Sequence, residues 1–181
     1  MEKNPNVEYI MLSERKIAKR VKELAEQMDK LYGGRKPVVV CILKGSVVFF
    51  ADLIRNMKIP LTIDFMSVSS YGNGTTSGEL KIKQDLATDI TGRDVLIVED
   101  IIDSGNTLYN LKKLLNARSP ASVNIVTLLD KPARREVPIE PEYTGFVIED
   151  EFVVGYGLDY AEEYRNLPYV GVLKRSVYEN N

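Results

Sequence analysis

Histidine is absent from the sequence, and that absence excludes more chemistry than any residue present. Without histidine there is no Ser-His-Asp or Cys-His nucleophile and no His-containing metal site. Any proton transfer must therefore use aspartate, glutamate, lysine or tyrosine. Cys41 is the only cysteine, and it lies inside the apolar run VVVCIL, where we expect a buried thiol. A chain with no possible internal disulfide suits a reducing compartment, so we expect a cytoplasmic protein.

Long apolar stretches and an excess of positive charge are missing as well. No stretch reaches the ~18 apolar residues of a membrane span, and the first ten residues show no signal-peptide pattern. We therefore expect no membrane association. The net charge of −2 gives no global basic field for nucleic-acid binding. The 181 residues are enough for one domain with a sizeable core.

What the sequence does contain is a regular alternation of strands and helices. Continuous β-branched runs such as PVVVCIL and DVLIVED are typical of parallel strands covered on both faces. We therefore predict an α/β fold, with a parallel sheet core flanked by helices. Helices are predicted over 13–31, 46–57 and 106–117, and strands over 37–43, 60–70, 79–85, 94–100 and 121–130.

The amino-acid composition of the chain changes after Lys131. The segment KPARREVPIEPEYTG carries three prolines and many charges, and short apolar runs broken by acids and tyrosines follow it. This composition predicts a small accessory lobe, the hood, over the carboxyl edge of the sheet. We predict a single domain, 1–181, with its core at about 13–137 and its hood formed by about 1–12 and 138–181.

The segment VLIVEDIIDSGNTL joins a buried strand to a polar loop and a helix. We expect the strand to end at Glu99, which places Glu99 and Asp100 at the carboxyl edge, where α/β sheets bind ligands. The small residues of DSGNT and the helix N-terminus behind them form a phosphate cradle, with hydroxyls from Ser104 and Thr107. No Walker motif is present. The two acids suit ribose hydroxyls or Mg²⁺, so the loop favours a sugar phosphate.

This segment resembles the phosphoribosyl-diphosphate-binding motif of the type I phosphoribosyltransferases. The resemblance extends over nearly the whole chain, and specifically to the bacterial hypoxanthine-guanine branch, through ILKGSVVF, SSYGNGTTSGEL, LLDKPARR, FVVGYGLDY and YRNLPYVGVL. It implies the type I phosphoribosyltransferase fold and a Mg²⁺-dependent reaction of purine salvage. The 5-phosphoribosyl group of phosphoribosyl diphosphate would pass to N9 of hypoxanthine or guanine, giving IMP or GMP and pyrophosphate. The family implies a homodimer or homotetramer.

The resemblance also implies roles for individual residues on the sugar-phosphate side. Asp103 matches the catalytic base beside purine N7, where a carboxylate can take a proton and stabilise positive charge. The segment Ser70–Gly78 matches a mobile lid, and LKG matches a loop whose Leu43–Lys44 peptide is predicted to be cis, or to become cis when ligand binds. The expected phosphoribosyl-diphosphate-binding residues are Lys44, Gly45, Ser70, Tyr71, Glu99, Asp100, Asp103, Ser104, Gly105, Asn106, Thr107 and Arg165.

On the purine side, the resemblance implies four residues. Lys131 would donate to the 6-oxo group, which lysine can do and which disfavours the 6-amino group of adenine. Phe152 would stack on the base, and Val153 would present backbone groups to its edge. Asp159 would belong to this side and to a second Mg²⁺ site, so that the expected metal ligands are Glu99, Asp100 and Asp159.

Two alternatives remain open. A regulator of the same fold would bind phosphoribosyl diphosphate and control a nucleic acid, but it would need a basic face that this acidic chain lacks. A phosphoribosyltransferase for xanthine or a pyrimidine would differ only in its base pocket.

Overall fold

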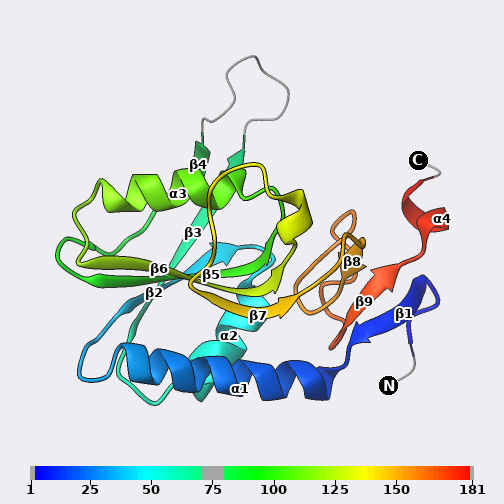
Figure 1. Cartoon of the computed structure of the whole chain (residues 1–181), viewed down its shortest axis with the longest axis horizontal. Coiled ribbons are helices and arrows are strands. Elements are labelled where there is room, and N and C mark those ends of the chain that lie inside the picture. Colours follow the sequence, from blue (N-terminus) through cyan, green and yellow to red (C-terminus); the bar gives the residue numbers. More distant parts are fainter. Residues whose placement is uncertain (1–2, 71–79, 180–181) are drawn as a thin grey trace.

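A six-stranded mixed sheet forms the centre of the computed structural model, which describes residues 3–70 and 80–179 (Figure 1). Its strand order is β4-β3-β2-β5-β6-β7, and every neighbouring pair is parallel except β3 and β4. The strands of this sheet are β2 (Val38–Leu43), β3 (Thr62–Ser70), β4 (Leu80–Gln84), β5 (Asp94–Ile102), β6 (Ser122–Asp130) and β7 (Tyr143–Val147).

Helices cover both faces of the sheet, as the continuous apolar strands require. Helices α1 (Glu14–Leu31) and α2 (Val47–Asn56) lie on one face, and α3 (Asn106–Asn116) lies on the other (Figure 1). Helix α1 begins after Ser13, whose hydroxyl accepts a hydrogen bond from the Lys16 N–H at 3.3 Å. The predicted α/β architecture is confirmed.

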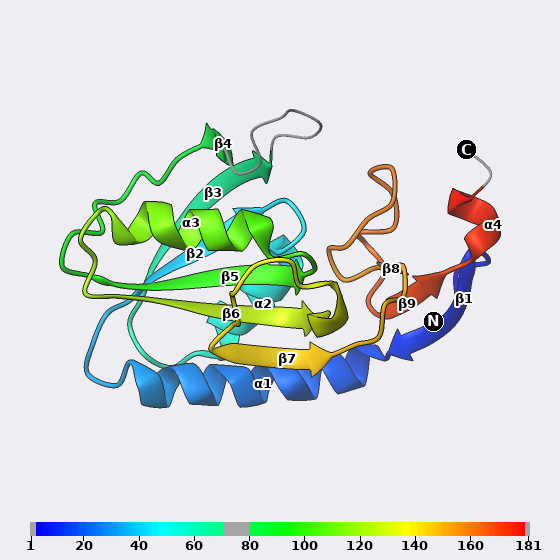
Figure 2. The same cartoon turned by 45° about the horizontal axis from the view of Figure 1, so that its top comes forward.

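A small antiparallel sheet, in the order β1-β9-β8, forms the hood. It lies beyond the arrowheads of β5, β6 and β7, so it faces the carboxyl edge of the large sheet (Figure 2). Buried hood residues such as Val153 and Val172 join the same apolar cluster as α1 and α2. The hood elements are β1 (Val7–Leu12), β8 (Val153–Val154), β9 (Val170–Leu173) and the short α4 (Arg175–Tyr178).

Two boundaries differ from those expected. Residues 143–147 were assigned to the hood, but β7 pairs with β6 and extends the large sheet. Its residues are only partly buried, because it is an edge strand, and prolines precede it. Strand β5 was expected to end at its acids, Glu99 and Asp100, yet it continues to Ile102 because β6 pairs with it that far.

Candidate active site

The cleft opens where β2 and β5 separate. Their ladder stops at the pair Cys41–Val98, after which β2 continues beside β3 and β5 continues beside β6. From Glu99 onward, one side of β5 therefore has no neighbouring strand. This is the switch point of the sheet, where ligands of α/β proteins bind. A cavity of about 350 Å³ lies there, lined among others by Lys44, Glu99, Asp100, Asp103, Ser104, Gly105, Thr107, Asp159 and Arg165.

The phosphate loop, Asp103–Thr107, turns from β5 into α3. Gly105 is the residue before the helix and has a positive φ of 84°. A β-carbon there would lie 2.6 Å from Ile139 Cγ2, so both backbone conformation and space require glycine. The first turn of α3 contains no acidic side chain, and its N–H groups have no helical carbonyl to bind. The turn therefore offers an anion its amides and the positive end of the helix dipole.

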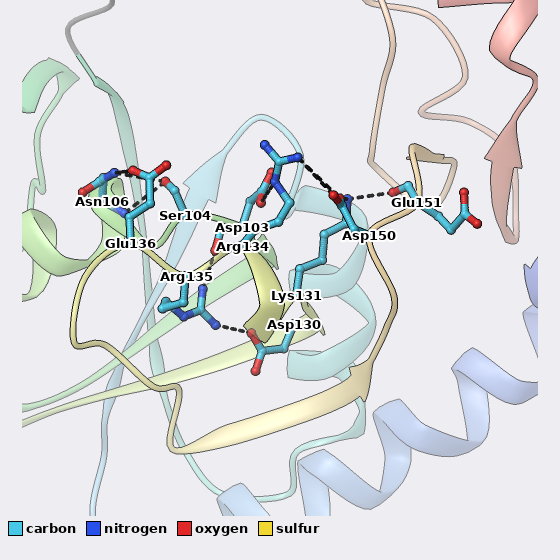
Figure 3. A network of polar contacts seen from close by, with 10 residues as sticks. All are labelled: Asp103, Ser104, Asn106, Asp130, Lys131, Arg134, Arg135, Glu136, Asp150 and Glu151. Carbon is cyan, nitrogen blue, oxygen red and sulfur yellow. Dashed lines mark hydrogen bonds and ion pairs between the residues drawn. The ribbon is translucent and has the colours of Figure 1, made fainter.

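The segment after β6 holds this loop from behind (Figure 3). Arg135 donates to the Asp103 carbonyl at 2.6 Å and pairs with Asp130. The Glu136 N–H donates to the Ser104 carbonyl at 3.0 Å, and the Asn106 amide donates to the Glu136 carboxylate at 2.6 Å. These contacts fix the backbone of the loop and direct the Asn106 side chain away from the cavity.

Glu99 and Asp100 form the floor of the cleft. Burial raises the pKa of the Glu99 carboxyl well above its usual range, and the Asp100 charge adds to that shift. Burial also raises the pKa of Asp100 to about 6, against opposing hydrogen bonds from its own N–H and that of Ile101. Glu99 Oε2 is buried with no hydrogen-bond partner among the described residues. A buried carboxylate oxygen without a partner, beside a second carboxylate, is a favourable environment for a cation.

The loop after β2 approaches this floor through its backbone. The Leu43–Lys44 peptide is cis, as predicted. A β-carbon on Gly45 would lie 1.7 Å from Asp100 Oδ2, so only glycine fits against that carboxylate. The Lys44 side chain is exposed, and its Nζ lies 3.1 Å from Glu162 Oε1. Lys44 therefore offers the cavity its backbone, while its ammonium group pairs at the surface.

Arg165 reaches the cavity from the hood. It donates to the Gly157 carbonyl at 2.8 Å, and its Nη2 lies 2.8 Å from Asp159 Oδ1 and 3.3 Å from Glu162 Oε2. Its Nε is buried without a partner among the described residues. Asp159, an expected metal ligand, is thus held by an arginine in this structure. Both residues line the cavity.

A second cavity of about 520 Å³ adjoins the first and shares Asp100, Ile101, Asp103 and Asp159 with it. Lys131 forms one wall, and it is only 7% exposed. Its Nζ donates to the Glu151 carbonyl at 2.7 Å and lies 3.5 Å from Asp150 Oδ1 (Figure 3). A buried ammonium group at a cavity wall can donate to a ligand but cannot accept from one.

Aromatic residues line the same cavity. Phe152 is 38% exposed and stacks on Tyr178, with ring centroids 4.8 Å apart and an interplanar angle of 21°. Tyr160 meets the Phe152 ring edge-on at 5.6 Å. Val153, Leu158 and Tyr178 line the same cavity. Phe152 is therefore a cavity residue and not part of the apolar core.

Comparisons with known proteins identify the family of this chain. The family model described as phosphoribosyl transferase domain matches residues 10–161. The hypoxanthine-guanine phosphoribosyltransferase of Bacillus subtilis is 53% identical over 176 residues, covering 97% of this chain and 98% of that protein. The chain belongs to the bacterial hypoxanthine-guanine phosphoribosyltransferases. The activity of this family is phosphoribosyl transfer in purine salvage, and its members typically use Mg²⁺.

Two further relatives agree with that family. The structure of a hypoxanthine phosphoribosyltransferase from Staphylococcus aureus superposes with a TM-score of 0.93 at 52% identity, covering 96% of this chain and 95% of that one. The bifunctional protein TilS/HprT of Listeria innocua is 53% identical over 96% of this chain. The chain spans 27% of the length of that relative.

Within this hypoxanthine-guanine phosphoribosyltransferase fold, most of the residues singled out from the sequence lie together at the two cavities. Asn106 and the Lys44 ammonium group point elsewhere. Ser70 ends β3 opposite Leu80, whereas Tyr71 and residues 71–78 of the expected lid lie outside the described residues.

The residues at this phosphoribosyltransferase cleft that sequence reasoning missed include Arg134, Arg135, Asp150 and Tyr178. The arginines were seen only as a basic cluster, KPARR, and nothing in the sequence says that they flank Asp103. Tyr178 belongs to α4, which follows the apolar strand β9. An aromatic residue at that place was the only indication in the sequence that it could line the cleft. For the described helices, none is long and apolar enough to cross a lipid bilayer.

Proposed function

We propose that this chain transfers the 5-phosphoribosyl group of phosphoribosyl diphosphate to N9 of hypoxanthine or guanine, giving IMP or GMP and pyrophosphate. One observation carries the proposal: the phosphate loop, the unpaired floor acids and the Lys131 ammonium group face two adjoining cavities that share Asp103. A sugar phosphate and a 6-oxopurine could therefore meet at that carboxylate.

The sugar-phosphate half of the substrate would occupy the first cavity. The amides and hydroxyls of the phosphate loop support binding of the 5′-phosphate, through Ser104, Gly105 and Thr107. Asn106 would contribute its backbone, because its side chain is held by Glu136. Lys44 and Gly45 would bind pyrophosphate through backbone groups, and Arg165 would bind it through its guanidinium group. Ser70 and Tyr71 would fold over the diphosphate, which excludes water from an activated sugar.

The floor acids fit Mg²⁺, since Glu99 Oε2 is an orphaned buried acceptor beside a second carboxylate. No group of three or more acidic, cysteine or histidine side chains in the described part of the chain forms a ready cage. This agrees with a Mg²⁺ ion that takes one or two carboxylates and completes its shell with water and substrate oxygens. Glu99 and Asp100 would hold one ion or the ribose hydroxyls, and Asp159 a second ion. Mg²⁺ held there would supply positive charge that offsets the negative charge of pyrophosphate.

The purine would occupy the second cavity. Lys131 would donate to O6, Phe152 would stack on the base and Val153 would offer backbone groups at its edge. Asp103 would accept the N7 proton as N9 attacks the sugar carbon and the bond to pyrophosphate breaks. The same carboxylate would stabilise the positive charge that develops on the ribosyl group.

A panel of bases tests this proposal directly. The purified chain is incubated with phosphoribosyl diphosphate, Mg²⁺ and either hypoxanthine, guanine, xanthine, adenine or uracil, and nucleotide formation is measured. We expect IMP and GMP, with little product from adenine or uracil. Xanthine or uracil as the preferred substrate would indicate a phosphoribosyltransferase of different base preference. Binding of phosphoribosyl diphosphate without any product would indicate the regulator.

We also propose a cytoplasmic homodimer or homotetramer. Light scattering on the purified chain separates the two assemblies from a monomer.

A further inference from the structure

Arg134 lines the purine-side cavity and lies between Asp103 and Asp150 (Figure 3). It is the last residue of the short helix η1 (Pro132–Arg134), three residues after Lys131. Its Nε lies 2.6 Å from Asp103 Oδ1, and its Nη1 lies 3.3 Å from Asp150 Oδ2. One guanidinium group therefore joins the phosphate loop to the segment before β8.

The contact with Asp103 occupies one oxygen and leaves the other. Asp103 Oδ1 is buried, although the side chain as a whole is 46% exposed. The accessible surface of the carboxylate therefore lies away from Oδ1, and Oδ2 is the oxygen that a ligand can reach. A carboxylate has acceptor sites on both oxygens, so it can hold an arginine and a second donor at once.

The neighbouring Arg135 makes a different set of contacts. Arg135 is mostly buried and donates to the main-chain carbonyl of Asp103, so it holds the loop itself. Arg134 is 51% exposed and contacts only side-chain carboxylates in the described structure. An ion pair exposed to that degree contributes little to stability, and the guanidinium group can follow movements of its partners.

We propose that Arg134 is a positioning residue for the Asp103 base, holding Oδ1 so that Oδ2 faces the purine. The proposal rests on the proposed role of Asp103. Arg134 also shares Asp150 with Lys131, whose Nζ lies 3.5 Å from the same carboxylate. The residue expected to read O6 and the residue expected to take the N7 proton are therefore linked through Asp150 and Arg134.

A double-mutant cycle tests this role. We compare the parent, Arg134→Gln, Asp103→Asn and the double variant by single-turnover rate at saturating Mg²⁺, phosphoribosyl diphosphate and hypoxanthine. Equilibrium binding of phosphoribosyl diphosphate is measured in parallel. Coupling between contacting residues predicts that Arg134→Gln lowers the rate about tenfold in the parent and less than about twofold in the Asp103→Asn background. Binding of phosphoribosyl diphosphate should change less than about twofold.

Two further variants separate positioning from folding. Arg134→Lys keeps one donor for Asp103 and should recover part of the rate. Arg118→Gln removes the same charge from an arginine that pairs with Asp85 outside either cavity, and it should behave like the parent. Thermal unfolding midpoints of Arg134→Gln and Arg118→Gln should be similar.

Several results would overturn the proposal. An equal loss of rate in both backgrounds would mean that Arg134 acts on the substrate without Asp103. Unchanged rates would remove it from catalysis, and a joint loss of rate and phosphoribosyl diphosphate binding would make it part of the scaffold. If Asp103→Asn alone keeps the parental rate, the base assignment fails as well, which the single variant reveals before the cycle is completed.

Discussion

The carboxylates at the floor of the cleft lack basic partners, whereas those at its rim form ion pairs. The floor acids, Glu99 and Asp100, have raised pKa values because they are desolvated, and no arginine or lysine pairs with them in the described structure. The rim acids, Asp103, Asp159 and Glu162, each pair with a basic side chain. The same residue types thus occupy two electrostatic environments within one cleft.

This difference separates two kinds of binding. Floor acids without a partner gain stability from an incoming cation or from hydroxyl donors. At the rim, Asp159 and Glu162 already pair with Arg165, so an anionic substrate that binds this guanidinium group must exchange places with them. The floor is therefore prepared for a ligand in advance, whereas the Arg165 ion pairs at the rim rearrange when a ligand binds. Four variants test this division, from the largest expected effect to the smallest.

Asp103→Asn removes the carboxylate that we propose as the general base. A positioned general base contributes about 10²–10⁴ in rate, so we expect single-turnover chemistry to fall by that factor. Affinity for phosphoribosyl diphosphate should change less than about tenfold, because the amide can still accept a hydrogen bond. Asp85→Asn, at a surface pair with Arg118, is the matched control. Near-parental chemistry in Asp103→Asn would remove the residue from the mechanism.

Glu99→Gln combined with Asp100→Asn removes both floor charges and keeps their shape. We expect the Mg²⁺ and phosphoribosyl diphosphate concentrations for half-maximal rate to rise by about tenfold or more, since Mg²⁺ binds through carboxylate oxygens. Initial rates across a Mg²⁺ titration provide the measurement. If the double variant shows the parental Mg²⁺ dependence, the metal binds elsewhere.

Asp100→Asn alone should stabilise the metal-free protein. The pKa of Asp100 is about 6 in the folded state and has an ordinary value of 3.8, so the folded state binds more protons between these values. Parental stability therefore falls as pH rises through that window, by roughly 2–3 kcal/mol in total. Urea unfolding with a chelator should show the variant to be more stable at pH 7, with the gain lost below pH 4. An equal gain at both pH values would contradict the argument.

Lys131→Gln changes the proposed ligand of the purine O6 and leaves the floor acids unchanged. Glutamine can accept a hydrogen bond from a 6-amino group, which lysine cannot. We expect the kcat/KM preference for hypoxanthine over adenine to fall by about tenfold, with a smaller effect on phosphoribosyl diphosphate binding. Lys112→Gln, at a pair with Glu142 outside both cavities, is the control. An unchanged preference would mean that Lys131 does not read O6.

The sequence predicted the floor better than it predicted the rim. Glu99 and Asp100 follow a continuous apolar strand, and strand pattern alone places them at the carboxyl edge. The pairing of Arg134 with Asp103 depends on how a short helix after β6 turns back, and no periodicity encodes that turn. Strand β7 was missed for a related reason, since its half-exposed residues lack the continuous apolar pattern of a central strand.

The contact between Gly157 and Gly45 limits how this cleft can be redesigned. A β-carbon on Gly157 would lie 2.0 Å from the Gly45 carbonyl oxygen, and one on Gly45 would meet Asp100. Hood and core therefore approach each other here through the Gly157 and Gly45 backbones, with no room for a side chain on Gly157. A set of variants made to change base preference can substitute Phe152 or Tyr178, which line the base cavity. A substitution at Gly157 must instead reposition the hood, and one at Gly45 must displace the Asp100 side chain. We expect variants with substitutions at these two glycines to be depleted under selection for folded protein. The frequency of substitutions at Gly45 and Gly157 would then show how well the selection removes misfolded variants.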